Sequence, residues 1–260
     1  MYNQLILLFA VSIISGGGVL LLPKLSYKHF PILLAFGGSY LFSFMMVHVL
    51  PEYFSFVFSQ NISMQLAGGY MLAGALVQLT IDYLSQGIAH SHHAPAGSGH
   101  HHNSMQVTDQ SLGLVVALCV HALFDGLLLG MPSAQLHVHC AHSVAFGGLL
   151  LGIILHKIPA TISLVSVLLH HGRKRSYILL ALLCFSIATP LSWLASSYLS
   201  SNNTLSASWL IVGWGMATGN LGHIATTILS ESNPDHKIDA TKVGVSMLGV
   251  LVALLLVYQG

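Results

Sequence analysis

Histidine is the residue type that stands out in this 260-residue chain, with 17 copies against eight Lys and Arg together. Two of them, His121 and His156, lie in the middle of long apolar runs, and Asp125 follows His121 by four residues. On a helix, two residues at that spacing share one face. Imidazole and carboxylate groups are ligands of Zn²⁺ and neighbouring first-row ions. Because ionisable groups inside a membrane are costly and usually functional, these three side chains predict a metal site with one position left open.

A plainer interpretation of His121 and Asp125 is a hydrogen-bonded polar pair that joins two helices. The second histidine at the same depth, His156, favours a metal site over that alternative because two imidazoles and a carboxylate make a ligand set. Pro159 follows within a turn of His156 and removes a helical hydrogen bond, which would open backbone carbonyls at this depth.

The composition predicts a membrane protein. Only 6% of the residues are charged and 54% are hydrophobic, whereas a soluble domain has roughly 25% charged residues. We therefore expect an all-α, polytopic membrane helix bundle that forms one domain over residues 1–260, with eight transmembrane helices. The expected segments are 4–22, 31–50, 64–88, 111–131, 143–170, 176–198, 207–229 and 241–258. The first would be a retained helix rather than a signal peptide, because the first basic residues follow it.

Basic residues predict how the helices are oriented. Those outside the apolar segments fall in the connections after the first, fifth and seventh segments: Lys24, Lys28, Arg173, Lys174, Arg175, Lys237 and Lys242. These connections share one face of the membrane with the loop 89–110. The positive-inside bias puts that face in the cytoplasm and both termini outside. A bacterial inner membrane is the expected location.

Histidine also gathers on both sides of the membrane. On the outer side, an entrance that collects metal is predicted from His48, Glu52, His137, His139, Cys140 and His142. On the inner side, exit or chelation is predicted from Asn220, His223, Glu231, His90, His92, His93, His100, His101 and His102. Alternatives without a metal-binding role stay open. The outer cluster could be an incidental polar loop, residues 89–110 could be a surface tract, and His223 could be a packing residue. For Gln78 and Asp82, satisfied polar residues inside the bundle are favoured over pathway residues.

Several motifs together resemble one family of membrane proteins. His121-Ala-Leu-Phe-Asp125-Gly and His156-Lys-Ile-Pro159-Ala are similar to the fourth- and fifth-helix signatures of the ZIP (Zrt/Irt-like) metal transporters. Further similar stretches are Phe36-Gly-Gly, His48-Val-Leu-Pro51-Glu52 and Ser186-Ile-Ala-Thr-Pro-Leu191. The resemblance implies helices in a 3+2+3 arrangement with inverted repeats, a two-metal centre on the fourth and fifth helices, and a homodimer.

The chain departs from the pattern of that family at three positions. Ala122 stands where Asn is frequent, Lys157 where an acidic residue is common, and Ala160 where Glu or His is usual. The Lys157 ammonium would substitute for the second metal ion, with Asp125 as its nearest candidate counter-charge. We therefore expect a single, weaker metal site.

These features predict transport of divalent transition-metal ions, with zinc favoured over Fe²⁺, Mn²⁺ or Cd²⁺. Uptake toward the cytoplasm is what the resemblance to the family implies. The expected partners are the lipid bilayer and the transported ion, without nucleic acid, and no catalytic residue or catalytic cofactor is assigned. Two rival functions remain. One is an intramembrane metal-dependent hydrolase, which lacks a His-Glu-x-x-His motif here. The other is a degenerate family member that senses or buffers metal without conducting it.

Overall fold

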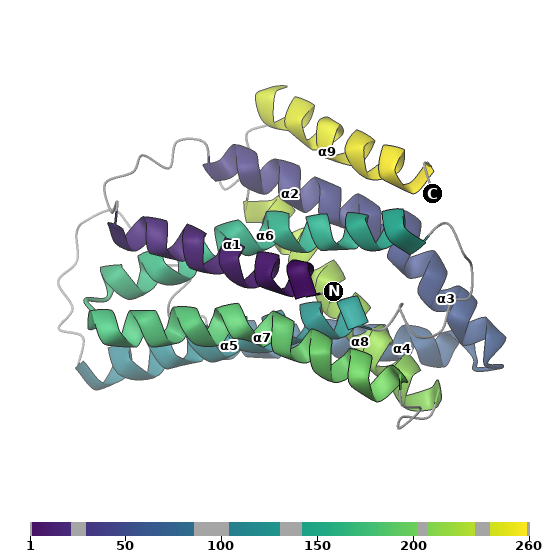
Figure 1. Ribbon diagram of the computed structural model, residues 1–260, viewed down its shortest axis with the longest axis horizontal. Coiled ribbons are helices and arrows are strands. Elements are labelled where there is room, and N and C mark those ends of the chain that lie inside the picture. Colours follow the sequence, from purple (N-terminus) through teal and green to yellow (C-terminus); the bar gives the residue numbers. More distant parts are fainter. Residues whose placement is uncertain are drawn as a thin grey trace.

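The computed structural model describes residues 2–21, 30–85, 104–130, 142–201, 207–231 and 240–258, and within these ranges the chain is helical with no strand. The helices lie in a bundle, most of them running close to its long axis (Figure 1). In chain order they are α1 (Tyr2–Leu21), α2 (Phe30–Phe44), the π-helical turn η1 (Met45–Val49), α3 (Leu50–Ser59), α4 (Met64–Ser85), α5 (Ser104–Gly130), α6 (His142–His170), α7 (Arg175–Ser201), α8 (Ala207–Glu231) and α9 (Ala240–Tyr258).

Seven stretches of the described chain are long and apolar enough to cross a membrane. They correspond to seven of the eight expected segments. The remaining expected segment, 207–229, corresponds to α8, which is not among the seven stretches. That helix has 25 residues, which is sufficient length, but polar residues such as Asn220, His223 and Thr226 lower its hydropathy. The amino-acid pattern therefore identified the helices correctly, while α8 is less apolar than the others.

The second segment is longer than expected. We predicted that it ends at residue 50, which is wrong, because α2, η1 and α3 continue as one stretch from Phe30 to Ser59. Pro51 has no N–H and would interrupt a regular α-helix. Here the π-helical turn precedes it, and the Leu50 N–H bonds to the Met45 carbonyl five residues earlier. The turn reorganises the hydrogen bonds just before the proline, so the helix can continue.

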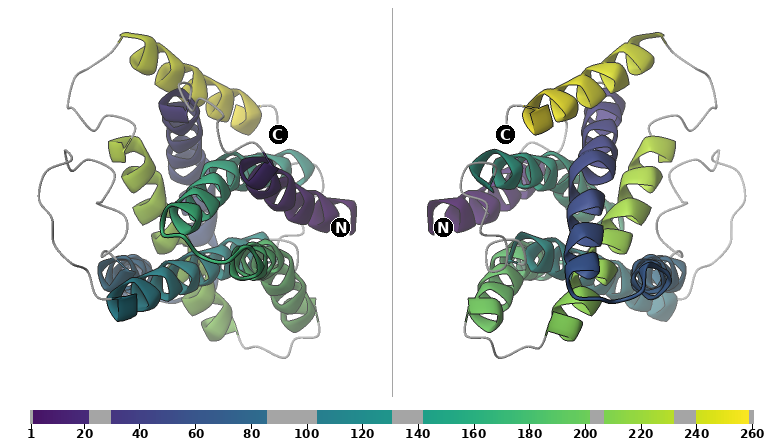
Figure 2. Two further views of the ribbon diagram at one scale, coloured as in Figure 1. Left: turned by 90° about the vertical axis from the view of Figure 1, so that its left-hand side faces the viewer. Right: turned by 90° about the vertical axis from the view of Figure 1, so that its right-hand side faces the viewer.

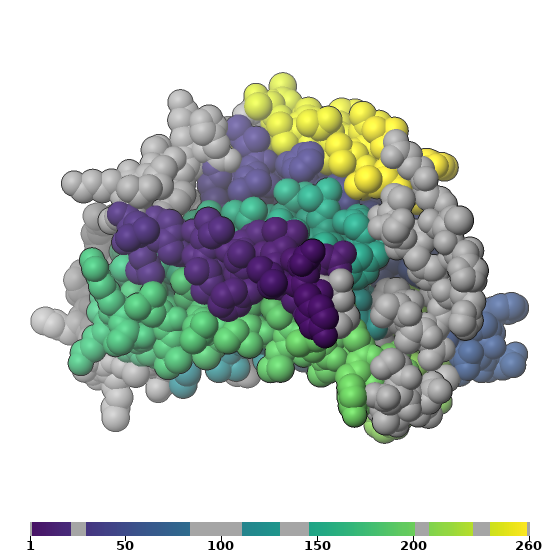
Figure 3. Space-filling view, viewed as in Figure 1, coloured from purple at the N-terminus to yellow at the C-terminus, as the bar shows by residue number. Residues whose placement is uncertain are grey.

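Three pairs of helices pack most extensively: α5 with α7, α2 with α9, and α4 with α8. Helix α6 lies against both α1 and α2, and the two end-on views place it within the bundle (Figure 2). On one face of the molecule α1 and α7 run side by side over much of the surface (Figure 3). Large apolar side chains point outward from several helices, for example Leu72, Leu76 and Leu79 of α4. An apolar exterior around buried polar groups is the arrangement expected in lipid.

Hydroxyl groups of α7 join it to α5. Each one donates to a backbone carbonyl of α5, the pairs being Thr189 to Ala122, Ser192 to Leu123 and Ser196 to Gly126. A Cβ at Gly126 would collide with the backbone of α7. Small residues and interhelical hydrogen bonds are the means by which helices associate where the hydrophobic effect is absent. This contact fixes α5 at the depth of His121 and Asp125.

Helices α4 and α8 approach even more closely. A Cβ at Gly74 would overlap the backbone of Met216, and a Cβ at Gly219 would overlap the backbone of Met71. The two glycines therefore allow direct contact between the helix backbones. The contact also sets which residues of α4 face α8 on the turns that follow, Gln78 and Asp82 among them.

We expect Gly219→Ala to destabilise the protein, because the new methyl group pushes α8 away from α4. Overpacking of this kind costs about 1–3 kcal/mol. Thermal unfolding in detergent, followed by size-exclusion chromatography, measures the change. The matched control is Gly68→Ala on α4, where a Cβ meets nothing within 4 Å. Equal stability of the two variants would contradict the close contact.

Candidate metal centre

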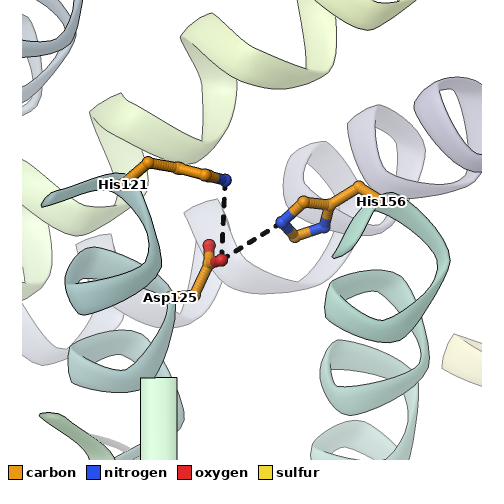
Figure 4. Close-up of side chains that lie close together, drawn as sticks. All are labelled: His121, Asp125 and His156. Atoms are coloured by element: carbon orange, nitrogen blue, oxygen red, sulfur yellow. Dashed lines mark hydrogen bonds and ion pairs between the residues drawn. The ribbon is translucent and has the colours of Figure 1, made fainter. Parts of the chain in front are cut away.

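Three buried side chains meet between α5 and α6. His121 and Asp125 lie one turn apart on α5, and His156 points toward them from α6 (Figure 4). The Asp125 Oδ2 atom lies 3.5 Å from the His121 Nε2 atom and 3.2 Å from the His156 Nε2 atom. Each residue offers one donor atom within 4.8 Å of the others, and each is at most 4% exposed. Within the described chain this is the one group of three or more His, Cys, Asp or Glu side chains that could hold a metal ion.

The second nitrogen of His156 indicates its tautomer. His156 Nδ1 lies 2.9 Å from the Gly152 carbonyl oxygen, and a carbonyl can only accept a hydrogen bond. A neutral His156 therefore carries its proton on Nδ1 and directs the lone pair of Nε2 at the Asp125 carboxylate. Two acceptors facing each other at 3.2 Å in a buried site repel one another. A cation between them would remove that repulsion, so these groups could hold a metal ion.

His121 is held in a similar way by a different element. Its Nδ1 atom lies 3.4 Å from the Oδ1 atom of Asn220 on α8. Asn220 is in turn a partner of Gln78 on α4. The centre is therefore bordered by four helices: α5 and α6 supply its donor atoms, and α8 and α4 supply polar groups behind them.

Lys157 lies fully buried beside the centre, but the structure directs its ammonium to α7. Lys157 Nζ donates to Thr189 Oγ1 at 2.8 Å and lies 4.1 Å from the centroid of the Phe185 ring. Among the described residues, the ion-pair partners of Asp125 are His121 and His156, not Lys157. The hydroxyl and the aromatic face thus contact the buried ammonium directly, and no carboxylate of the described residues lies within ion-pair distance of it.

Pro159 lies inside α6, and the helix continues through it. Because proline has no N–H, the Leu155 carbonyl lacks its usual helical partner. This carbonyl faces α2 at Gly37, where a Cβ would come within 3.5 Å of the oxygen. The expected opening of the backbone next to His156 therefore lies on the α2 side of α6.

The expected outer entrance is described only in part. His48 and Glu52 form a pair, with 3.4 Å between Nε2 and Oε2 and both side chains partly exposed. Helix α2 runs antiparallel to α6, with Gly37 opposite Leu155 and Phe44 opposite Gly148. The pair follows Phe44 along the chain, so it lies toward the N-terminal end of α6, away from the level of His156. Outside the described residues lie His137, His139 and Cys140, and the side chain of His142.

On the other side of the centre, His223 pairs with Asp82. The His223 Nε2 atom lies 3.1 Å from Asp82 Oδ2, and both side chains are partly exposed. The side chain of Glu231 is outside the described set, and so are His90, His92, His93, His100, His101 and His102. The structure therefore places His48, Glu52 and His223 in pairs of their own, separate from the group of three.

Gln78, Asp82 and Thr189 have contacts that sequence reasoning did not assign. Gln78 and Asp82 are four residues apart, a spacing that could have placed both on one face of α4. Thr189 belongs to the motif Ser186-Ile-Ala-Thr-Pro-Leu191, but its contacts with a side chain of α6 and a carbonyl of α5 depend on how the helices pack.

A sequence model describing the ZIP zinc transporters matches residues 1–256. The chain belongs to the ZIP zinc transporter family. This membership confirms the resemblance that His121, Asp125 and His156 indicated, and it accords with the apolar helices. The protein is therefore a multi-pass membrane protein of a family that transports metal ions.

Known relatives are zinc transporters of vertebrates. Zinc transporter ZIP9 of Micropogonias undulatus is 33% identical over 125 residues, or 47% of this chain and 36% of the relative. Zinc transporter ZIP9 of Macaca fascicularis is 33% identical over 159 residues, or 54% of this chain and 65% of the relative. Zinc transporter ZIP9-B of Xenopus laevis is 36% identical over 126 residues, or 48% of this chain and 37% of the relative. The matched regions thus span between about one third and two thirds of these relatives.

We expect Lys157→Met to raise the zinc affinity of the purified protein about tenfold, equivalent to about 1.4 kcal/mol. The substitution keeps the length of the side chain and removes a buried positive charge beside a site that takes a cation. Isothermal titration calorimetry with Zn²⁺ measures the change. Lys174→Met, at an exposed basic residue before α7, should leave the affinity unaltered. A lower affinity in Lys157→Met would contradict the repulsion between the ammonium and the ion.

Proposed function

We propose that this protein carries divalent transition-metal ions, zinc first among them, through the membrane by way of His121, Asp125 and His156. The observation that carries the proposal is the convergence of two imidazole nitrogens on the Asp125 carboxylate in a buried site. Family membership supports the same function.

The donor atoms suit zinc in type and spacing. In a tetrahedral site with bonds of about 2.0–2.1 Å, neighbouring donors are about 3.3 Å apart. Asp125 Oδ2 lies at 3.2 and 3.5 Å from the two imidazole nitrogens, so a small movement of the side chains would complete the three bonds. The fourth position is left for water or for another ligand. Such an incomplete shell suits transport, because an ion must bind well enough to enter and weakly enough to leave.

Lys157 supports a single ion in the centre. The site has one carboxylate, and a buried ammonium lies on the residue after His156. A second divalent ion there would add charge without another carboxylate to balance it. We therefore propose one ion per centre, with the ammonium of Lys157 in the place of the second.

Eight membrane crossings and outward-facing termini complete the proposed architecture. Helix α8 runs parallel to α4, with Asn220 beside Gln78 and His223 beside Asp82. A helix that follows a membrane span in this way would cross the bilayer itself, and its polar residues would face the interior. The 3+2+3 arrangement with inverted repeats, a homodimer and a cytoplasmic His-rich loop belong to the same proposal. That loop is shorter than the predicted 89–110, because α5 already begins at Ser104. The relatives are vertebrate, so a bacterial inner membrane stays a prediction.

A route for the ion follows from the order of the polar groups. His48 and Glu52 would collect it outside, together with His137, His139, Cys140 and His142. From the centre it would pass Asn220 toward Asp82 and His223, and then Glu231 and the histidines of the loop 89–110. Uptake toward the cytoplasm is the proposed direction.

Uptake of radioactive zinc into proteoliposomes tests the proposal. We expect saturable uptake by the native protein and the rate of empty vesicles for His121→Ala, since that change removes one of three ligands. The matched control is His170→Ala, at an exposed histidine at the end of α6, which should transport at the native rate.

Three other outcomes would contradict the proposal. Equal uptake by His121→Ala and the native protein would remove His121 from the pathway. Zinc binding without uptake by the native protein would indicate a sensor or a buffer. Zinc-dependent hydrolysis of a lipid or a peptide, lost in His121→Ala, would favour the hydrolase.

A further inference from the structure

A chain of polar side chains leads from the metal centre to a partly exposed carboxylate. Asn220 Oδ1 lies 3.4 Å from His121 Nδ1, and Asn220 Nδ2 donates to Gln78 Oε1 at 3.4 Å. Gln78 Nε2 then donates to Asp82 Oδ1 at 2.7 Å. Asn220 and Gln78 are almost fully buried, whereas the Asp82 side chain is 35% exposed.

Close packing of α4 and α8 keeps these groups opposite one another. Gln78 lies one turn after Gly74, and Asn220 directly follows Gly219, the two glycines at which the helix backbones touch. A side chain on either glycine would separate the helices and break the amide contact. The chain of hydrogen bonds is therefore built into the helix packing.

Only one direction of hydrogen bonding suits this chain. Both oxygens of the Asp82 carboxylate accept, one from Gln78 and the other from His223. The NH₂ group of Gln78 must then face Asp82, which turns its oxygen toward Asn220. Asn220 must donate to that oxygen, which turns its own oxygen toward His121. An acceptor at this position requires a proton on the Nδ1 atom of His121.

We infer that Asn220, Gln78 and Asp82 are positioning residues that hold His121 in its Nδ1–H tautomer and so keep the lone pair of Nε2 available to the metal ion. The inference rests on the proposed function for its purpose, because the lone pair faces the same carboxylate as that of His156. Partners beyond the ligands commonly fix the tautomer of a metal-binding histidine. Here the partners are two amide side chains, Asn220 and Gln78, of which Gln78 is hydrogen-bonded to the carboxylate of Asp82.

The opposite tautomer shows what the chain prevents. With its proton on Nε2, His121 would donate to Asp125 Oδ2, 3.5 Å away. That hydrogen bond would fill the space between two donor atoms of the site. A metal ion would then have to displace the proton as well as bind, and its affinity would fall.

Nitrogen NMR of the full-length, metal-free protein in lipid nanodiscs tests the inference at mildly alkaline pH. With ¹⁵N-labelled histidine, the signals of His121 are those absent from His121→Ala. We expect a protonated Nδ1 and a bare Nε2 in the native protein. Gln78→Met keeps the shape of the side chain and removes its hydrogen bonds, so the Nε2–H form should appear and zinc affinity should fall about tenfold.

A second substitution separates positioning from mere packing. Asp in place of Asn220 can only accept from His121 Nδ1, whatever residue stands at position 78. The double variant Gln78→Met, Asn220→Asp should therefore regain the native tautomer. Gln65→Met, at an exposed glutamine of the same helix, should leave the tautomer and the zinc affinity unaltered.

The inference is overturned by a protonated Nε2 in the native protein, by an unaltered tautomer in Gln78→Met, or by a double variant that stays in the Nε2–H form. The NMR measurement needs no metal and no transport. A failure of zinc uptake with the expected spectra would reject the proposed function alone, and normal uptake with contrary spectra would reject this inference alone.

Discussion

The structure depends on one electrostatic constraint, the meeting of two imidazole nitrogens with a carboxylate oxygen where almost no water reaches. Lone pairs that face one another in such surroundings are unfavourable unless a positive charge lies among them. The Gly152 carbonyl prevents a neutral His156 from turning its proton toward Asp125. The three groups could therefore hold a cation without rearrangement of the helices, and contacts of several helices keep them in place.

The polar groups around the centre are distributed over separate contacts between helices. Thr189 accepts a hydrogen bond from Lys157 of α6 and donates one to the Ala122 carbonyl of α5. One hydroxyl group of α7 thus joins the two helices that supply the donor atoms, α5 and α6. On the opposite side, glycines bring α4 and α8 together so that amide groups can meet. In lipid, where apolar surface gives little reason for helices to associate, such contacts supply the specificity.

Much of this could be predicted from the sequence. Hydropathy located the helices, because few charged residues interrupt the apolar runs. The four-residue spacing of His121 and Asp125 put both on one face, and His156 was recognised by its depth and by the family motif. The direct partners of Lys157 could not be predicted, since the motif that contains Thr189 does not say which helix its hydroxyl faces. Asp125 was expected as the nearest counter-charge of Lys157, and its charge does act on the ammonium, but the ammonium contacts Thr189 and Phe185 of α7 directly.

Two local features of the helices were less plain in the sequence. Helix α8 was expected as a span, yet its hydropathy is lower than that of the other seven, and two of its polar residues, Thr218 and Asn220, are buried in the bundle. The second span was expected to end just before Pro51, because a proline usually interrupts a helix. The π-helical turn that lets the helix continue has no sequence pattern as plain as that of an α-helix.

That π-helical turn also determines which way the C-terminal part of the second span faces. Leu41, Met45, Val49 and Tyr53 are all buried, although residues spaced by four drift about 40° per step around a regular α-helix. The wider turn absorbs this drift. Loss of a single residue between Met45 and Val49 would rotate everything beyond it by about 100°, and the Tyr53 hydroxyl would leave the carbonyls of Ala67 and Ile211 that it now contacts. The length of this short stretch is therefore as strictly constrained as the identity of any residue in it.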